Sequence, residues 1–183
     1  MSKEESKEVV ENDQSVPLTD VTKKIYERIV NGNAYEVDTA NRFRIAQFIH
    51  FGTHTTLHLG AGERAGALNS YVSVFKKFPQ TEEEWQDVIK ISGGRWPQEK
   101  NTDAEQETQN NHFVKIYKRK PDMNNPNDNA AVTVITYGLR PANRNMDSEK
   151  VGIKTFEHIY DYAPTSAVDW DIVRAISYSG AVR

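Results

Sequence analysis

The spacing of apolar residues is the feature that most limits how this chain folds, because it repeats with a helical period over much of the sequence. In the first such segment, Val21, Ile25, Ile29 and Val30 recur at helical spacing behind a capping residue at Thr19 or Asp20. Capping residues, glycines and prolines bound the other segments in the same way. The predicted helices run from Thr19 or Asp20 to Asn31, from Thr39 to about Phe51, from Ala65 to Phe78, from Thr81 to Gly93, from about Ser148 to Tyr162 and from Ser166 to Ser177.

The periodicity changes to an extended pattern in the middle of the chain. Two runs rich in β-branched and aromatic residues, His112–Lys118 and Ala131–Tyr137, flank a loop of turn-forming residues, PDMNNPNDN. This order is typical of an antiparallel hairpin. The sequence therefore predicts an α+β fold that is predominantly helical, with about six helices and one β-hairpin at about 112–137.

The first residues differ in composition from the rest. Residues 1–16 are charged, rich in serine and almost devoid of large apolar side chains, so they cannot offset the entropy that ordering costs. We expect a disordered acidic N-terminal arm at 1–16. The remainder, 17–183, has the length of one domain and predicts a single helix-rich domain that contains the hairpin.

Composition limits the chemistry and the compartment. The chain has no cysteine, which excludes disulfides, thiolate metal sites and a cysteine nucleophile. It has no apolar run of the length of a membrane span and no apolar signal-peptide segment at its start. These observations predict a soluble intracellular protein without a membrane contact. Since no catalytic signature or cofactor motif stands out strongly, we expect no cofactor and favour a non-enzymatic role.

Cationic and aromatic residues occur together in the later part of the chain. A formal net charge of -3 argues against a protein that coats nucleic acid through bulk charge alone, but not against a local basic groove. Cations bind phosphates and flat rings stack on bases, as single-stranded nucleic acid requires. The alternative is an exposed strand whose lysines deter edge aggregation. The candidate nucleic-acid ligands in this pattern are Lys115, Tyr117, Lys118, Arg119, Lys120, Arg140 and Arg144.

Two patterns favour a different class of protein. His50, His54 and His58 follow one another at four-residue steps, which on a continuous helix would place three imidazoles on one side. They are weak candidate metal ligands, and the alternative is three ordinary histidines. The stretch TLHLGAGERAG, from Thr56 to Gly66, resembles the strand, glycine turn and helix of nucleotide- or S-adenosylmethionine-binding enzymes. Its alternative is a helix–helix turn in which glycines supply positive φ.

The stretch from Tyr137 to Arg174 carries a resemblance to a known family. YGL, an Asn-Arg element and FEHIYDYAPTSAVDWDIVRA resemble the C-terminal core of flexible filamentous plant-virus coat proteins. The counterparts of the family's elements are Tyr160-Asp161-Tyr162, Thr165-Ser166 and Arg174-Ala175, and Arg140 to Asn143 (RPAN) is similar to a Pro-Ala-Asn element in some members. The resemblance covers under a quarter of the chain.

The resemblance implies a mostly helical core, terminal arms that link neighbouring subunits, and a groove that holds single-stranded RNA. It also implies that Asp161 corresponds to the family's core aspartate, which orients an arginine; Arg42, Arg95, Arg140 and Arg144 are the candidates. We therefore predict a self-assembling coat or nucleocapsid protein in a virion or the host cytoplasm. It would form a homo-oligomer through lateral contacts and the N-terminal arm. The alternatives are a small ligand-binding enzyme that uses the turn from Gly60 to Gly66, or a non-catalytic interaction module.

Overall fold

The computed structural model describes residues 2–11 and 15–183, and every regular element in these residues is a helix. The chain divides into two compact units, Met1–Gln98 and Glu99–Arg183, which are described separately below as unit 1 and unit 2. The single domain expected over 17–183 stays a prediction.

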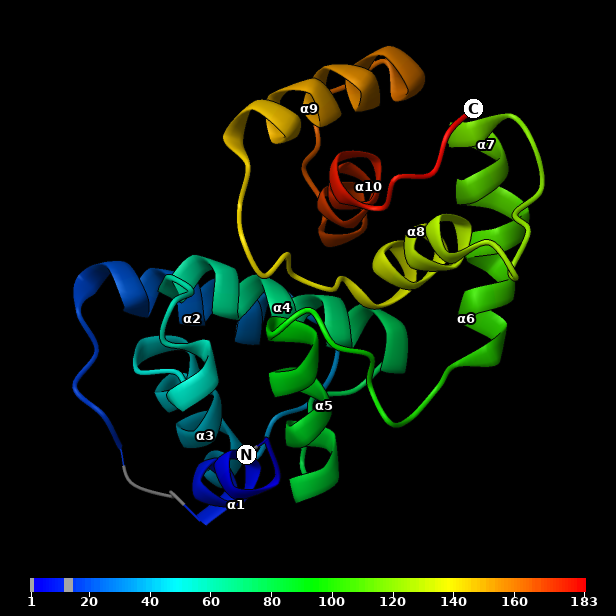
Figure 1. The fold of residues 1–183 in the computed structure, drawn as a ribbon. Coiled ribbons are helices and arrows are strands. Elements are labelled where there is room, and N and C mark those ends of the chain that lie inside the picture. Colours follow the sequence, from blue (N-terminus) through cyan, green and yellow to red (C-terminus); the bar gives the residue numbers. More distant parts are fainter. Residues whose placement is uncertain (1, 12–14) are drawn as a thin grey trace. The chain divides into compact units, whose positions relative to one another are not determined.

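Unit 1 consists of α1 and the helices that surround a buried core (Figure 1). Its elements are α1 (Ser2–Glu11), α2 (Asp20–Asn31), α3 (Thr39–His50), the short 3-10 helix η1 (His54–Thr56), α4 (Ala61–Phe75) and α5 (Glu82–Ser92). Thr19, Asp38 and Thr81 accept backbone hydrogen bonds at the starts of α2, α3 and α5. In the core, Phe48 and Trp85 meet edge to face, with ring centroids 5.4 Å apart.

The predicted disordered arm is ordered as α1 over Ser2–Glu11, which corrects the expectation for those residues; residues 1 and 12–14 lie outside the described part of the chain. Helix α1 packs along α5 (Figure 1), and Val9 is buried. The carboxylate of Glu5 accepts hydrogen bonds from the backbone N–H of Thr55, at 2.5 Å, and from its hydroxyl, at 2.9 Å. Ordering is therefore stabilised by tertiary contacts that the composition of residues 1–16 does not reveal.

Unit 2 is a second helical unit with its own core. Its elements are α6 (Thr102–Glu107), the π-helix η2 (Thr108–Phe113), α7 (Val114–Tyr117), α8 (Pro126–Tyr137), α9 (Met146–Tyr160) and α10 (Ala167–Tyr178). Helix α10 packs against both α8 and α9 (Figure 1). Phe113, Ile135, Phe156 and Ile172, from four different elements, are buried in one apolar cluster.

The predicted β-hairpin at 112–137 is wrong, because no strand occurs in the residues that the structure describes and this region is helical. The first predicted strand lies in η2 and α7, and the second lies in α8. Asn125 caps α8 and Pro126 occupies its first turn, so the presumed hairpin loop contains a helix start. Gly138, with φ of 71°, ends α8 in the left-handed conformation that favours glycine. The fold is thus all-helical rather than α+β.

Burial explains why a β-branched segment is helical here. Val132 and Ile135 of α8 are buried in the apolar cluster of unit 2, and Thr136 hydrogen-bonds to Thr108 at 2.9 Å. The helix propensities of Val, Ile and Thr fall below that of Ala by only about 0.7 kcal/mol or less per residue. Burying one valine or isoleucine side chain contributes about 1.5–3 kcal/mol, so packing decides the conformation.

Candidate nucleic-acid interface

The basic run predicted as a strand lies at the C-terminal end of α7, where its side chains separate into exposed and buried groups. Lys115, Lys118 and Lys120 are exposed, and within residues 2–11 and 15–183 none of them forms an ion pair with a carboxylate. Lys118 ends α7 in the left-handed conformation, with φ of 60°. Tyr117 is 4% exposed, and its hydroxyl lies 3.3 Å from Ser179 Oγ, so its ring is part of the core.

Arg119 is partly exposed and is bound to a buried carboxylate of unit 2. Its Nη2 donates to Asp128 Oδ1 at 2.7 Å, and its Nη1 donates to Asp128 Oδ2. The hydrogen bond from Arg119 lowers the pKa of Asp128, against the opposing effect of burial. Arg119 also donates from Nε and Nη2 to the carbonyl of Val182, at 3.1 and 3.0 Å. The guanidinium therefore ties α7 to α8 and to the C-terminal segment.

The two later arginines are likewise engaged by acids. Arg140 is 2% exposed and lies 3.4 Å from Asp171 Oδ1, which also accepts from Arg174 at 2.8 Å. Arg144 forms a two-fold hydrogen-bonded pair with Glu149 on α9. In these pairs a carboxylate already occupies the guanidinium, so a phosphate would have to displace the carboxylate in order to bind.

Asp161 lies just after α9, is exposed and adopts φ of 63°. Among the described residues it forms no ion pair, so it does not orient an arginine in this structure. The aspartate that does so is Asp171 on α10, which contacts Arg140 and Arg174.

Lys115 lies against the aromatic residues at the end of α9. Its Nζ is 4.2 Å from the centroid of the Tyr160 ring, a cation–π contact that leaves the ammonium charge unneutralised. The Tyr160 ring is stacked on Phe156, with centroids 4.5 Å apart and planes at 13°. Burial raises the pKa of Tyr160 to about 12. Tyr160 thus joins the basic run of α7 to the aromatic element after α9.

Tyr162 is the accessible ring of this group. It is 47% exposed, and it meets Phe156 edge to face with centroids 5.4 Å apart. Its hydroxyl donates to Asp169 Oδ1 at 3.0 Å, which fixes the orientation of the ring. Burial alone would raise the pKa of Asp169, but backbone hydrogen bonds from Ser166 and Thr165 bring it below its ordinary value. The carboxylate therefore stays ionised and accepts from a neutral tyrosine at neutral pH.

The π-helix η2 contributes to the same region. Burial lowers the pKa of His112, while the carboxylates of Glu107 and Asp169 oppose this shift and the charge of Lys115 adds to it. His112 is therefore neutral at neutral pH and leaves the positive charge to Lys115. Short π-helical segments often occur at functional sites.

The two tyrosines of this group, Tyr160 and Tyr162, lie outside the basic run from which the candidate ligands are predicted. We call the exposed group Lys115, Lys118, Lys120 and Tyr162 the lysine–tyrosine face. Trp170 follows Asp169 on α10 and is 40% exposed. The sequence signal for Tyr162 is the Tyr160-Asp161-Tyr162 element, the counterpart of a motif in the coat-protein family.

The histidine run of unit 1 does not form one cluster on a helix. His50 ends α3, where its Nδ1 lies 3.3 Å from Thr22 Oγ1, while His54 lies in η1 and His58 follows it. In residues 2–11 and 15–183, no group of three or more His, Cys, Asp or Glu side chains could hold a metal ion.

Most of the predicted glycine turn from Gly60 to Gly66 is helical, since α4 begins at Ala61 and only Gly60 precedes it. The 3-10 helix η1 lies where a nucleotide-binding unit would have a strand. A Cβ at Gly60 or Gly62 would meet nothing within 4 Å. Arg64 instead uses its guanidinium to cap the carbonyls that end α3, donating to Ile49 O and His50 O at 2.8 Å each.

Comparison of the chain with protein-family models, curated proteins and solved structures finds no match. No helix in the described part of the chain combines the length and the apolar character that crossing a membrane requires.

Proposed function

We propose that this chain is a structural protein that binds single-stranded RNA through the lysine–tyrosine face of unit 2 and assembles with copies of itself. The observation that carries the proposal is the contact between Lys115 and Tyr160, because the Tyr160 ring lies 6.1 Å from the exposed ring of Tyr162 and so places one lysine near an accessible aromatic ring. The resemblance of Tyr137–Arg174 to filamentous plant-virus coat proteins implies the same class of function.

The chemistry of this face suits an unpaired strand. A base stacks on any accessible aromatic ring, since every base has a π-face, and lysines bind the phosphates that flank it. The hydrogen bond from Tyr162 to Asp169 holds the ring in place before RNA binds, which reduces the entropy lost on stacking. Tyr160 suits a supporting role, because its ring already contacts both Phe156 and Lys115.

The number of available cations sets the strength of binding. Arg119, Arg140 and Arg144 are paired with acids, whereas Lys115, Lys118 and Lys120 are exposed without a carboxylate partner in the described residues. Each phosphate contact on a single strand contributes about 0.7 to the slope of log affinity against log salt concentration. Three contacts predict a slope of about −2 for an isolated subunit.

The test is RNA binding by fluorescence anisotropy, with a labelled oligouridylate and a series of salt concentrations. Tyr162→Ala should weaken binding by about 1–3 kcal/mol, which is the cost of removing one stacked base. Tyr162→Phe keeps the ring and should retain most of the affinity. Lys115→Gln should reduce the salt slope by about 0.7.

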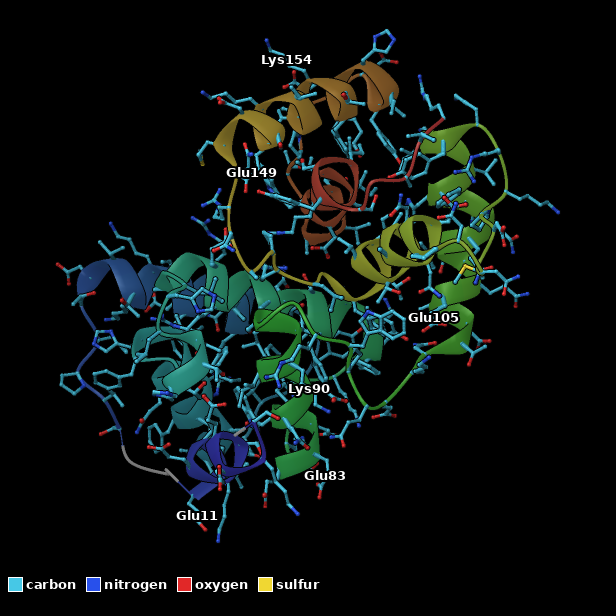
Figure 2. The ribbon with its side chains drawn as sticks, viewed as in Figure 1. Glu11, Glu83, Lys90, Glu105, Glu149 and Lys154 are labelled. Carbon is cyan, nitrogen blue, oxygen red and sulfur yellow. The ribbon has the colours of Figure 1, made fainter. Side chains whose placement is uncertain are left out.

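Lys154→Gln is the matched control for Lys115→Gln. Lys154 is exposed on the outer side of α9 (Figure 2), so its loss should leave the salt slope unchanged. Equal effects of the two lysine variants, or normal binding by Tyr162→Ala, would refute the proposed face. Electron microscopy of the purified protein tests assembly, and a monodisperse particle free of nucleic acid contradicts the coat function.

A further inference from the structure

The segment between α7 and α8 carries Lys118 and Lys120, and a buried carboxylate holds it in place. Asp128, in the first turn of α8, has a side chain only 1% exposed. It accepts from two guanidinium nitrogens of Arg119 and, at 2.8 Å, from the backbone N–H of Asp122. Both ends of the segment from Arg119 to Asp122 are therefore bonded to one carboxylate.

The guanidinium of Arg119 has all of its nitrogens engaged. Besides Asp128, it donates to the carbonyl of Val182 from two nitrogens and to the carbonyl of Lys120 at 3.3 Å. Arg183 donates from Nε to the carbonyl of Ile116 at 2.8 Å, and Asn127 donates to the carbonyl of Gly180 at 3.2 Å. The C-terminal segment is thus bonded to Arg119, to α7 and to α8, and a phosphate that bound Arg119 would have to displace its bonds to Val182.

Lys118, on one side of Arg119, has a backbone conformation that needs support. Its φ of 60° lies in the left-handed region, which costs a residue other than glycine, asparagine or aspartate free energy and persists only where the surroundings determine it. Lys118 and Lys120 flank Arg119 in sequence, and both are exposed. The Arg119–Asp128 ion pair therefore fixes the chain at Arg119, the residue between the two lysines.

We propose that the Arg119–Asp128 ion pair is a positioning device for RNA binding: Asp128 and Arg119 hold Lys118 and Lys120 on the lysine–tyrosine face and do not contact RNA themselves. This inference rests on the proposed function. It assigns opposite roles to neighbouring cations, because Arg119 acts through the lysines while Lys118 and Lys120 bind phosphate. A buried acid is then required for the binding of a polyanion.

Removing one negative charge distinguishes positioning from simple electrostatics, because the two predict opposite changes in RNA affinity. Asp128→Asn removes a negative charge beside the lysines, so electrostatics alone predicts tighter RNA binding. Positioning predicts weaker binding, because the amide no longer pairs with the guanidinium and the segment loses its fixed geometry. Asp122→Asn is the matched control, since it removes the same charge from the same segment and keeps the oxygen that accepts from the N–H of Asn124 at 3.0 Å.

The experiment measures the affinity of the full chain for labelled oligouridylate across a salt series, with circular dichroism of each variant. We expect Asp128→Asn to bind more weakly and to lose up to about 1.4 from the salt slope, which is two phosphate contacts. Lys118→Gln and Lys120→Gln should each lose about 0.7, and Asp122→Asn should bind as tightly as the wild type or more tightly. Arg119→Lys keeps the charge without the two-pronged geometry and should behave like Asp128→Asn.

Each result tests either the positioning role of Asp128 and Arg119 or the proposed RNA binding on which that role rests. A folded Asp128→Asn protein that binds as tightly as Asp122→Asn overturns the positioning role, whatever Lys118→Gln does. If Asp128→Asn fails to fold, Arg119→Lys decides in its place, and wild-type binding by that variant overturns the role. Wild-type protein that binds no RNA refutes the proposed function itself, which is a different failure.

Discussion

The contact between α9 and α10 predicts an unusual response to adding a single methyl group. Gly152 lies inside α9 and faces α10, where a Cβ would lie less than 3.0 Å from Ser177 Oγ, 3.1 Å from Val173 O and 3.4 Å from Val173 Cγ1. The Ser177 hydroxyl can move away from this Cβ only by losing its hydrogen bond to Val173 O, which is 2.7 Å long. Gly152→Ala should therefore destabilise unit 2, although alanine favours helices.

The magnitude follows from two opposing effects. Overpacking a close helix contact costs about 1–3 kcal/mol, and replacing glycine by alanine inside a helix returns about 1 kcal/mol. The expected net loss for Gly152→Ala is about 1 kcal/mol. In Ser177→Ala/Gly152→Ala the nearest obstacle is removed and only the Val173 contacts remain. The double variant should recover most of the loss, with a coupling energy of about 1 kcal/mol.

Urea unfolding followed by far-UV circular dichroism measures these free energies. Gly62→Ala in α4 is the control, because a Cβ there meets nothing within 4 Å. It should be neutral or stabilise the protein by up to about 1 kcal/mol. Strict additivity of Gly152→Ala and Ser177→Ala, or a stabilising Gly152→Ala, would refute the close contact between α9 and α10.

Three further predictions concern other parts of the chain. Glu5→Gln should speed amide exchange at Thr55, its hydrogen-bond partner, whereas exposed Glu8→Gln should not. Arg144 lowers the pKa of Glu149, so this pair stabilises unit 2 above the ordinary pKa of 4.5 and loses that effect as pH falls further; Glu149→Gln should flatten acid unfolding. A single domain over 17–183 predicts one calorimetric transition with equal van't Hoff and calorimetric enthalpies, and two transitions would contradict it.

The predicted helices agree with the structure where the sequence supplies both an apolar period and a local cap. Thr81 and Glu84 form the capping box expected at the start of α5, and Ser166 caps α10 together with Asp169. These signals act within one turn of helix, so they do not depend on the rest of the fold. The boundary differs where no side chain caps the helix: α4, whose N-cap is Gly60, begins at Ala61 rather than at the predicted Ala65.

The β-hairpin was predicted because β-branched residues outweighed the cap signals. Phe113, Ile116 and Tyr117 have helical spacing, and Asn125-Pro126 is a helix start, but the segment also fits a strand–loop–strand pattern. Only the apolar cluster with α9 and α10 decides between the two, and that depends on residues distant in sequence. Tertiary packing therefore overrode a local preference.

The sequence names the cations of the candidate site but does not show which of them have acidic partners. The basic run identified Lys115, Lys118 and Lys120, which are exposed as a phosphate ligand must be. The sequence also predicts Arg119, in the same run, and Arg140 as ligands, but their acidic partners, Asp128 and Asp171, lie on α8 and α10. Sequence spacing cannot reveal such pairs, because they depend on how helices pack.

The small number of available cations has a consequence for how this protein would hold RNA. A net charge of -3 and only three exposed lysines in the basic run give each subunit little affinity of its own, and that affinity falls with salt. Stable retention then requires neighbouring subunits to bind one strand together, since linked sites raise the effective concentration of each contact. RNA binding should consequently be cooperative in protein concentration, and variants that block assembly should lose RNA even with the lysine–tyrosine face intact. Tight binding by a demonstrated monomer at physiological salt would contradict this reasoning and favour a site with more cations than this face provides.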